Sequence, residues 1–355
     1  MAVTVTPGER DSSELCQVPV GAPGRGQVRV KTLAVGVCGT DVEITSGGYG
    51  QPPLGSKRLV IGHESLLMVD ALGPGVSGWN TGQLAVGIVR RPCPERCAPC
   101  SRGRWDLCVT GNYLERGIKG LDGFMRESLV EDVAFLVPVP TSLQPVAVLV
   151  EPLSVVTKAV EEALRLRDTG ATAPIRALVT GAGPIGLLAA MLFRSRGLEV
   201  WVADRRPAGS PKAAVVTACG ARYVDTSATD LDDAVGDVRF DLAIEATGFA
   251  PLIFQAAALL ARDGALVLTG VTSGHHSIDV DANGLNRAMV LENQIIAGSV
   301  NACRAHYEAA VTSLEKWQSQ WPGLAGQLIT GRFPLTHYRE ALVKDADAIK
   351  SVVEL

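Results

Sequence analysis

The stretch from Ile175 to Arg206, IRALVTGAGPIGLLAAMLFRSRGLEVWVADRR, constrains the fold of this chain more than any other part of it. Gly181, Gly183 and Gly186 have the spacing G-x-G-x-x-G and stand between an apolar strand candidate and an amphipathic helix candidate. At such a turn the first glycine permits a sharp bend, the second lets a pyrophosphate approach the backbone, and the third lets the helix pack close to the strand. Because the free N–H groups of a helix N-terminus favour negative charge, the stretch predicts a dinucleotide site. A tight turn that binds nothing is the alternative.

The end of the next strand carries a mixed signal about the dinucleotide. Asp204 can accept hydrogen bonds from the ribose hydroxyls of NAD. Arg205 and Arg206 follow it directly and can pair with the 2′-phosphate of NADP, although a solvated pair of surface arginines is an equal alternative. We therefore expect NAD to be favoured and NADP to be possible.

Length and composition narrow the class of protein. A chain of 355 residues is longer than one ordinary domain, so we expect two. The net charge of -4 argues against a nucleic-acid partner and against an anionic membrane surface. The N-terminus lacks the features of a signal peptide, and no apolar run approaches the roughly 20 residues that span a bilayer. We expect a cytoplasmic protein whose 8 cysteines are metal ligands or buried thiols rather than disulfides.

The pattern of strands and helices changes along the chain. From 28 to about 140, short β-branched runs are separated by glycine and proline, which is typical of an all-β barrel or sandwich. A helix is expected from 147 to 167, and from 175 to about 271 strands alternate with helices, which indicates a doubly wound parallel sheet. The last of these helices is expected to stop at Gly264. Two further helices, at 305–316 and 337–343, and a strand at 349–353 should follow.

Four cysteines form a cluster in a short segment rich in proline, arginine and glycine. Cys93, Cys97, Cys100 and Cys108 have the spacing C-x3-C-x2-C-x7-C. Four thiolates so close together in a loop with little apolar content match a closed tetrahedral zinc site, which holds the loop in place of a core. Disulfide pairing is the main alternative, since the spacing is too short for a zinc finger that reads nucleic acid.

A second metal site is predicted from residues in separate segments. Cys38 lies in the turn VGVCGTD, His63 and Glu64 lie in LVIGHES, and Glu151 opens EPLS. Ligands with N, S and O atoms from separate loops are what an open catalytic zinc site requires, with one position left for water or substrate. Taken singly, a residue such as His63 is more often a hydrogen-bonded, half-buried histidine, and Glu151 could be a charge near a helix N-terminus. The prediction therefore rests on their joint presence upstream of a dinucleotide fold.

At these residues the chain resembles the zinc-dependent medium-chain dehydrogenase superfamily, and within it the glucose dehydrogenase branch. The resemblance covers nearly the whole chain. It implies an α/β protein with a GroES-like all-β catalytic domain and a doubly wound Rossmann dinucleotide-binding domain. We expect the catalytic domain at 1–150 with its structural zinc lobe at 93–108, the Rossmann domain at 151–290, and a return to the catalytic domain at 291–355. The motifs that carry the resemblance are Cys38-Gly39-Thr40-Asp41, Gly62-His63-Glu64, the four cysteines, GNYLERGIKGLDGFMRE (111–127), Glu151-Pro152-Leu153, the glycine turn, EATGF (245–249) and GSVNA (298–302).

The resemblance also implies which residues carry the chemistry. Thr40 would relay the proton of the substrate hydroxyl, while Glu115 and Asn301 would hydrogen-bond sugar hydroxyls. Val89 and Ser154 stand where glucose-oxidising relatives tend to carry a polar amide and an acid that hold these hydroxyls. The catalytic zinc would be held by Cys38, His63 and either Glu64 or Glu151. The implied cofactor-binding residues are Gly181, Gly183, Pro184, Ile185, Gly186, Asp204, Arg205, Arg206, Thr247 and Gly248.

The predicted reaction moves a hydride from a hydroxyl-bearing carbon of a polyhydroxylated ring to NAD(P)+, with zinc acting as a Lewis acid. The partner is a small sugar, polyol or cyclitol: an aldose oxidised at C1 gives a lactone, and a cyclitol or aminocyclitol gives a ketone. The resemblance further implies a homodimer or homotetramer. Two other classes stay open, a zinc-independent reductase of activated double bonds on the same fold and a non-catalytic nucleotide-binding protein.

Overall fold

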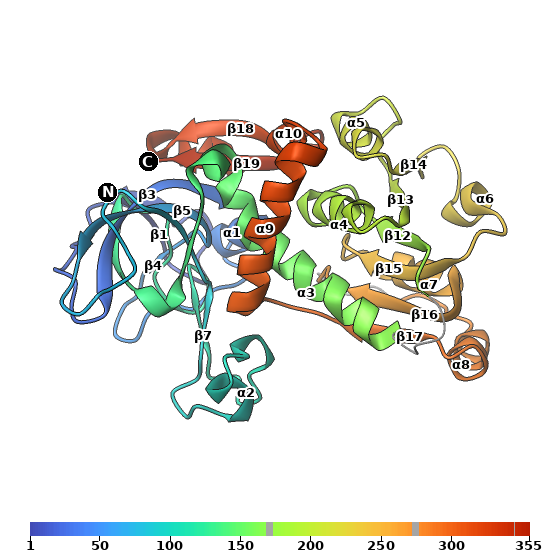
Figure 1. Cartoon of the computed structure of the whole chain (residues 1–355), viewed down its shortest axis with the longest axis horizontal. Helices are drawn as coiled ribbons and strands as arrows, with labels where there is room; N and C mark the ends of the chain where they lie inside the picture. The colour runs from blue at the N-terminus through green and yellow to red at the C-terminus, as the bar shows by residue number, and fades with distance from the viewer. Residues whose placement is uncertain (168–172, 272–276, 344) are drawn as a thin grey trace. The chain divides into compact units, whose positions relative to one another are not determined.

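The computed structural model describes residues 1–167, 173–271, 277–343 and 345–355 (Figure 1). It divides into two compact units. The first comprises Met1–Ser154, Asn301–Lys316 and Ala325–Leu355, and the second comprises Val155–Val300 and Trp317–Leu324. The second unit extends past the boundary expected at 290, because β17 (Ile295–Gly298) pairs with β16 (Leu260–Leu268) in its sheet. Residues 291–300 therefore belong to the second unit and not to the returning segment.

The first unit is organised around β3 (Gln27–Val37), the longest strand. The first eight residues of β3 alternate between buried and more exposed positions, as expected of a strand with one face on a core. Strand β3 pairs antiparallel with β5 (Glu64–Leu72), β10 (Ser128–Asp132) and β19 (Lys350–Glu354), so segments from both ends of the chain meet on it. The order of the main sheet is β11-β6-β5-β3-β19-β18, and β10 lies off this path. The expected all-β architecture is confirmed.

The other elements of this unit are short. The remaining strands are β1 (Ala2–Val5), β2 (Glu14–Cys16), β4 (Leu59–Val60), β6 (Leu84–Gly87), β7 (Arg90–Arg91), β8 (Leu114–Arg116), β9 (Gly120–Leu121), β11 (Leu136–Pro138) and β18 (Ile329–Pro334). The α-helices that lie or begin here are α1 (Gly39–Thr45), α2 (Ala98–Ser101), α3 (Val150–Arg167), α9 (Arg304–Gln320) and α11 (Tyr338–Ala341), with α10 (Leu324–Gln327) at a unit boundary. Single turns of 3₁₀-helix are η1 (Trp105–Leu107), η2 (Val133–Phe135) and η4 (Leu335–His337), and a longer one is η3 (Thr141–Leu149).

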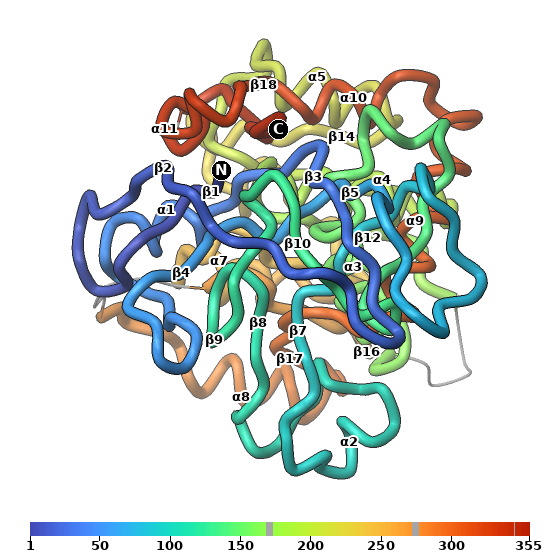
Figure 2. The backbone as a smooth tube through the Cα atoms, turned by 90° about the vertical axis from the view of Figure 1, so that its left-hand side faces the viewer, coloured from blue at the N-terminus to red at the C-terminus, as the bar shows by residue number. Residues whose placement is uncertain are grey.

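The segment with the four cysteines leaves the sheets between β7 and β8. Figure 2 shows β7 and β8 running toward it and α2 within it, at the bottom of the view. Arg90 and Arg91 of β7 pair with Glu115 and Leu114 of β8, so both ends of the cysteine loop are fixed on one short ladder.

The second unit contains a six-stranded parallel sheet in the order β14-β13-β12-β15-β16-β17. The chain starts at the centre and reverses direction across the sheet, which is the doubly wound Rossmann arrangement. The inner strands are almost continuously apolar and buried, as expected for a sheet covered on both faces. The strands not yet bounded are β12 (Arg176–Thr180), β13 (Glu199–Asp204), β14 (Arg222–Asp225) and β15 (Phe240–Glu245). The helices are α4 (Pro184–Ser195), α5 (Pro211–Ala218), α6 (Leu231–Val235), α7 (Ala250–Ala258) and α8 (Ala282–Leu291).

The helix expected to stop at Gly264 ends earlier. Helix α7 ends at Ala258, and the chain enters β16 at Leu260, which pairs with Phe240. Both side chains are buried, so packing in the sheet outweighs the helix propensity of the preceding alanine and leucine run. Gly264 lies inside β16, and the sequence prediction was wrong there.

One helical stretch, Thr141–Arg167, has the length and apolar composition to cross a membrane, contrary to the expectation that no run approaches that length. Within the protein, 83% of its most apolar window is buried, which is also what the core helix of a globular protein shows. The charged Glu151 and Lys158 interrupt this run and conceal it in the sequence.

Candidate active site

Cys38 and His63 meet because β3 and β5 are paired. Gly36 near the end of β3 lies opposite Glu64 at the start of β5, which brings the residues just beyond these strand ends together. Cys38 is the N-cap residue of α1, and its Sγ accepts a hydrogen bond from the Thr40 N–H at 3.2 Å. The Nε2 atom of His63 lies 3.1 Å from Cys38 Sγ. The structure therefore places the predicted thiol and imidazole at one point.

Asp41, which the sequence analysis did not assign a role, orients this pair. Its carboxylate is fully buried, and Oδ1 lies 3.4 Å from His63 Nδ1. The other oxygen, Oδ2, accepts the Cys38 N–H at 3.0 Å. Burial lowers the pKa of His63, but Cys38 and Asp41 together outweigh it and hold that pKa well above the usual value. A carboxylate behind the imidazole fixes the ring so that Nε2 faces the thiol, as is common for histidines that bind metals.

Two further carboxylates lie beside His63. Glu64 is buried in an ion pair with Lys350, whose Nζ lies 2.6 Å from each carboxylate oxygen. Glu151, in the first turn of α3, has no ion pair among the residues that the structure describes. Burial raises the pKa of the Glu151 carboxyl to about 7. His63, Glu64 and Glu151 each offer one ligand atom, and these atoms lie within 4.8 Å of one another.

This donor set suits a zinc ion. A thiol, an imidazole nitrogen and a carboxylate are the ligands of open, catalytic zinc sites. The observation that tests the fit is the carboxyl of Glu151: it is buried, and burial outweighs the charges of His63 and Lys350 and raises its pKa, so a bound cation would stabilise its charged form. We therefore find that Cys38, His63 and the neighbouring carboxylates fit the predicted metal.

Glu115 and Asn301, the predicted sugar ligands, lie next to each other. Glu115 is in β8, and its Oε1 accepts a hydrogen bond from Asn301 Nδ2 at 2.8 Å. Asn301 has a left-handed backbone with φ of 61°, which asparagine tolerates better than most residues. Arg90 also holds Glu115 Oε1, with its Nε at 3.0 Å.

The four cysteines of the lobe converge as predicted from their spacing. Their sulfur atoms all lie within 4.8 Å of one another, and Cys97 Sγ lies 3.9 Å from Cys108 Sγ. All four are free thiols, so the disulfide alternative is wrong. Burial raises the pKa of Cys100 to about 12, while hydrogen bonds from Thr110 and neighbouring groups outweigh burial and lower the pKa of Cys108 to about 6. The cluster has the ligands and the compactness of a structural zinc site.

The glycine turn has the geometry that its spacing predicts. Gly181 has φ of 97°, and a Cβ there would lie 2.7 Å from Thr247 Cγ2. Gly183 is the N-cap of α4, with Pro184 and Ile185 in the first turn, and a Cβ on Gly183 would meet nothing within 4 Å. A Cβ on Gly186 would collide with the Gly181 carbonyl oxygen. Of the three glycines of the turn, only Gly183 therefore has open space beside it, at the helix N-terminus where a pyrophosphate is expected.

Asp204 contacts the glycine turn directly. Its Oδ2 accepts the Ala182 N–H at 2.6 Å, and its Oδ1 accepts the Arg206 N–H at 2.9 Å. The side chain of Arg205 is exposed and that of Arg206 is half-buried. The carboxylate thus ties the turn to the end of β13 in addition to any contact with a ribose.

Thr247 and Gly248 follow the end of β15. Glu245 is fully buried and accepts the Thr247 N–H at 2.7 Å and the Gly248 N–H at 3.1 Å. Because β12 and β15 are parallel neighbours, this loop and the glycine turn lie at the same edge of the sheet. The predicted cofactor residues of the second unit are therefore brought together at the carboxyl ends of its strands.

Three charged residues of the first unit escaped the sequence analysis. Asp41, Arg90 and Lys350 are buried and hold His63, Glu115 and Glu64 respectively. The available signal was a charged residue inside or beside an apolar strand, as in IKSVVE at the C-terminus. Such residues are rarely buried without a partner.

Val89 and Ser154, where the resemblance predicts a departure from glucose-oxidising relatives, both make hydrogen bonds. The Val89 N–H donates to the hydroxyl of Tyr307 at 3.3 Å. The Ser154 hydroxyl donates to the Glu151 carbonyl oxygen at 2.6 Å. Ser154 is thus bound to the backbone of Glu151, and Val89 to the side chain of Tyr307.

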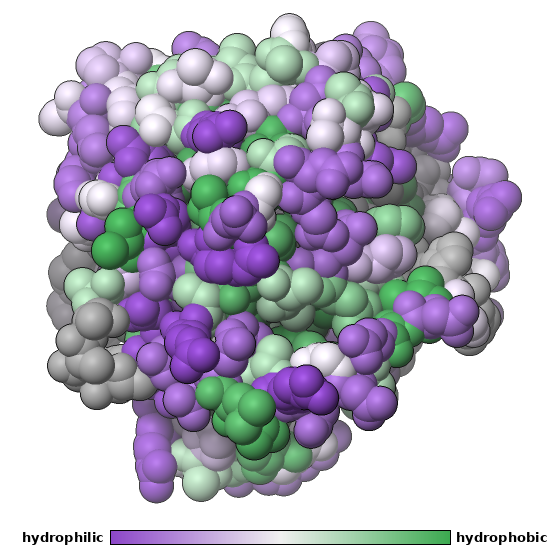
Figure 3. Space-filling model, turned by 90° about the vertical axis from the view of Figure 1, so that its right-hand side faces the viewer, coloured by the Kyte–Doolittle hydropathy of each residue, from purple (hydrophilic) through white to green (hydrophobic). Residues whose placement is uncertain are grey.

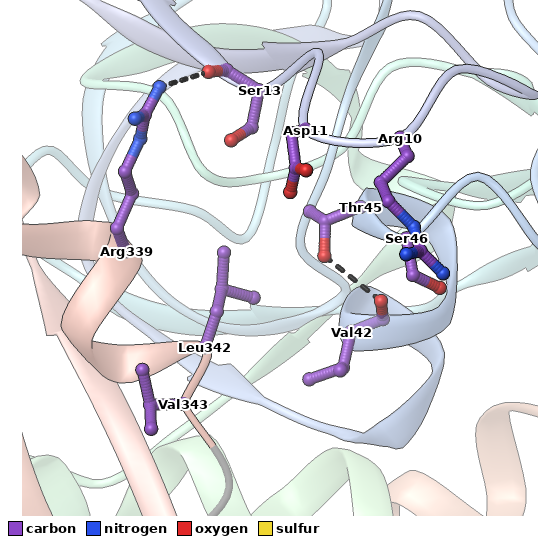
Figure 4. A pocket seen from close by; sticks show the side chains of 9 residues that line it. All are labelled: Arg10, Asp11, Ser13, Val42, Thr45, Ser46, Arg339, Leu342 and Val343. Atoms are coloured by element: carbon purple, nitrogen blue, oxygen red, sulfur yellow. Dashed lines mark hydrogen bonds between the residues drawn. The ribbon is translucent and has the colours of Figure 1, made fainter.

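One described cavity is lined by other residues than these clusters. It has a volume of about 450 Å³ and none of the predicted site residues lines it. Figure 4 shows Val42, Thr45 and Ser46 of the α1 region on one side and Arg339 on the other. It therefore lies at the C-terminal end of α1, whereas Cys38 caps the N-terminus of the same helix.

Family models match both parts of the chain. Residues 24–141 match the alcohol dehydrogenase GroES-like domain, and residues 144–355 match the glucose dehydrogenase C-terminus. Glucose 1-dehydrogenase of Thermoproteus tenax is 43% identical over 361 residues, which cover 100% of this chain and 99% of that protein. Glucose 1-dehydrogenase of Methanocella arvoryzae is 39% identical over 356 residues, again covering 100% and 99% of the two chains.

The chain belongs to the glucose dehydrogenase family. This places it in the zinc-dependent medium-chain dehydrogenase superfamily and makes it an NAD(P)-dependent dehydrogenase. Haloferax mediterranei glucose dehydrogenase, solved in complex with NADP, Zn and gluconolactone, is similar over 100% of this chain and 99% of its own, with a TM-score of 0.91 and 34% identity. 2R,3R-butanediol dehydrogenase of Bacillus subtilis, with a TM-score of 0.82 and 21% identity, shares the fold. For this member of the glucose dehydrogenase family, a sugar oxidoreductase is favoured over a double-bond reductase and over a non-catalytic nucleotide-binding protein.

Proposed function

We propose that the protein oxidises the C1 hydroxyl of glucose or a closely related aldopyranose to the lactone, with NAD+ or NADP+ as the hydride acceptor. The observation that carries this proposal is that the first unit contains two clusters of polar side chains. One cluster has the Cys38 thiol, the His63 imidazole and the neighbouring carboxylates, and the other is the Glu115–Asn301 pair. The first fits a zinc ion, and the second offers a carboxylate and an amide to sugar hydroxyls. The glucose dehydrogenases to which the chain is similar support the choice of substrate.

Each residue has a defined role in this reaction. Bound zinc supplies Lewis-acid chemistry, which lowers the pKa of a substrate hydroxyl. Thr40, two residues after Cys38, would relay the proton: its hydroxyl oxygen accepts the proton of the substrate as its own O–H proton passes toward solvent. Glu115 and Asn301 would bind ring hydroxyls and so fix the orientation of the sugar, and bound NAD(P)+ would supply the hydride acceptor. The protein thus contributes alignment and proton transfer.

Among the carboxylates, we propose Glu151 as the third zinc ligand. The charge of Glu64 is already matched by Lys350, and a second cation would compete for the same oxygens. Glu151 is buried without an ion pair among the described residues, so zinc binding would stabilise its charged form. Glu64 then stays bound to Lys350 beside the metal.

The choice between NAD and NADP depends on the residues at the end of β13. Asp204 supports NAD, because its carboxylate lies where ribose hydroxyls are expected. The exposed Arg205 supports NADP, and so does the NADP in the Haloferax mediterranei structure. We propose that both are accepted and that NAD is favoured.

We also propose a homodimer or homotetramer that forms through the edge of the parallel sheet. Strand β17 is an outermost strand of this sheet, so its outer edge offers unpaired backbone groups. Val290 and Leu291, which precede it in α8, are 64% and 67% exposed. Figure 3 shows apolar side chains, in green, in the lower part of the face on the α8 side of Figure 1. A second copy of the chain would cover them, and sedimentation velocity measures this directly.

We also propose that the protein is located in the cytoplasm. All eight cysteines are free, including four that converge in one loop and could oxidise there. Free thiols in this number persist in a reducing compartment.

The experiment that tests the proposed function is a substrate screen. The purified protein is supplied with glucose, other aldoses, inositols and aminocyclitols, each with NAD+ and with NADP+, and reduced cofactor is followed by absorbance. We expect turnover with aldopyranoses and a lactone as the product. Turnover with cyclitols alone, or cofactor binding with no turnover on any sugar, would overturn the proposal.

A further inference from the structure

We propose that Arg90 is a positioning residue that ties the four-cysteine lobe to the substrate-binding carboxylate of Glu115. The inference rests on the proposed function in one respect, the role of Glu115 as a sugar ligand. It adds that the lobe, so far only a structural feature, sets the affinity for the sugar through one guanidinium.

The guanidinium of Arg90 contacts two polar partners, one through Nε and Nη2 and the other through Nη1. Its Nε donates to Glu115 Oε1 at 3.0 Å, and its Nη2 lies 2.9 Å from the same oxygen in an ion pair. Its Nη1 donates to the Asp106 carbonyl oxygen at 3.1 Å. The ring of Tyr113 lies 3.8 Å from the guanidinium carbon. Because only 4% of Arg90 is exposed, these contacts replace water almost completely.

The contacts of Glu115 leave one of its oxygens for a ligand. Oε1 accepts hydrogen bonds from Arg90 Nε and, at 2.8 Å, from Asn301 Nδ2, and it is also the oxygen of the ion pair with Arg90 Nη2. Oε2 has no hydrogen bond within the part of the chain that the structure describes, and it is not among the fully buried unpartnered atoms. An ionised carboxylate can accept at both oxygens. Arg90 and Asn301 therefore clamp one oxygen and present the other to a sugar hydroxyl.

The other end of the connection is part of the cysteine lobe. Asp106 lies in η1, between Cys100 and Cys108, and is 4% exposed. Its carboxylate is held by Arg104, with Nε and Nη2 at 3.0 Å and 2.9 Å. The carbonyl that receives Arg90 is thus on a segment whose position is set by the lobe itself.

The geometry needs a guanidinium. A lysine would keep the positive charge next to Glu115, but its single ammonium cannot bond both Glu115 Oε1 and the Asp106 carbonyl with the spacing of the arginine fork. Glu115 would keep its charge partner and lose its fixed orientation. The loss should therefore fall on sugar binding and not on the chemistry at zinc or on cofactor binding.

The test compares Arg90→Lys with Arg91→Lys. Arg91 is the matched control, because it is the buried neighbour on β7 and its guanidinium binds Glu131 at 2.6 Å, with no bond to Glu115 among the described residues. Both variants are measured with their metal bound, for thermal unfolding, for KM and kcat with glucose, and for KM with the dinucleotide. We expect Arg90→Lys to raise the sugar KM about tenfold, with kcat and the cofactor KM changed by less than about threefold. Arg91→Lys should lower the unfolding temperature comparably and leave the sugar KM within about twofold of wild type.

Two further variants make each outcome decisive. Glu115→Gln should raise the sugar KM; if it raises the KM and Arg90→Lys does not, Arg90 does not position Glu115 and the inference fails alone. If Glu115→Gln leaves the KM unchanged while the wild type still oxidises glucose, the assignment of Glu115 and this inference both fail, and the proposed activity stands.

If Arg90→Lys does not fold, Tyr113→Leu tests the inference in its place, because it removes the ring beside the guanidinium and leaves Glu115 unchanged. A sugar KM raised about threefold supports the inference, and an unchanged KM overturns it.

Discussion

Asp204 has two functions in the proposed account. As an acceptor of the Ala182 and Arg206 N–H groups, it connects the glycine turn to the end of β13. As a carboxylate at that strand end, it is also the predicted ligand of the NAD ribose. The two functions can be separated, because only the second distinguishes NAD from NADP.

We expect Asp204→Ala to weaken NAD binding about tenfold and NADP binding by clearly less, because NADP keeps its phosphate contact with the arginines. Fluorescence titration with both reduced cofactors measures the ratio. Asp225→Ala is the control: Asp225 lies opposite Asp204 at the end of β14 and accepts the Ala208 N–H at 3.1 Å. An unchanged ratio of the two affinities would remove Asp204 from the cofactor choice.

Buried ion pairs connect the strands of the first unit. Glu131 of β10 is 4% exposed, and its Oε2 lies 2.6 Å from both Arg91 of β7 and Arg116 of β8. Burial raises the pKa of Glu131, but the two arginines outweigh it and lower that pKa from its usual 4.5. The carboxylate thus joins three strands that are otherwise in two different sheets.

We expect Glu131→Gln to lower the free energy of unfolding by about 3 kcal/mol at pH 7, because two buried guanidinium groups lose their counter-charge. Since the folded pKa lies below the unfolded value, the stability from this carboxylate is present above pH 4.5 and is lost as the pH falls through the folded pKa. Urea unfolding of both proteins should therefore give a difference that shrinks on acidification. A difference that is constant with pH, or absent at pH 7, contradicts this role.

The glycine turn permits a comparison between two of its glycines, Gly183 and Gly186. Gly183→Ala meets no atom within 4 Å, so we expect normal thermal unfolding but about tenfold weaker dinucleotide binding, because the methyl occupies the space of the pyrophosphate. Gly186→Ala pushes α4 away from the Gly181 carbonyl, so it should lower both stability and binding. Calorimetric titration and thermal unfolding give both quantities. Unchanged dinucleotide affinity in Gly183→Ala would show that the pyrophosphate lies elsewhere.

Features with a local pattern could be predicted from the sequence. The glycine turn, the alternation of strands and helices, and the four cysteines are recognisable because each depends on spacing within a few tens of residues. The stop expected at Gly264 was wrong because pairing of Leu260 with Phe240, a contact of the tertiary fold, decides where that helix ends. The local pattern alone does not contain this information.

Partners that are distant in the chain could not be predicted. Glu64 and Lys350 are separated by 286 residues, and Glu115 and Asn301 by 186. The resemblance proposed roles for Glu115 and Asn301 but gave no sign that they bond each other or that Arg90 holds them. Only the antiparallel pairing of β19 with β3 brings the C-terminal strand beside Cys38 and His63. Such contacts depend on the topology of the whole sheet.

The two units divide the proposed chemistry between them. All predicted ligands of the catalytic zinc, the sugar ligands and the cysteine lobe lie in the first unit, and the glycine turn lies in the second. Substitutions at Cys38 should therefore leave dinucleotide binding unaffected. The central claim is that Cys38 and His63 hold a zinc ion on which sugar oxidation depends.

The measurement that tests this claim most directly is the zinc content of the wild type and of Cys38→Ser, determined by mass spectrometry of metal-replete protein together with glucose turnover and dinucleotide affinity. We expect two zinc ions per wild-type chain, because the four cysteines of the lobe converge and His63 lies beside both Cys38 and two carboxylates. Cys38→Ser should retain the lobe zinc and dinucleotide affinity, lose most of the second zinc, and lose turnover by at least about a thousandfold. Full zinc content with full turnover in Cys38→Ser would contradict the account.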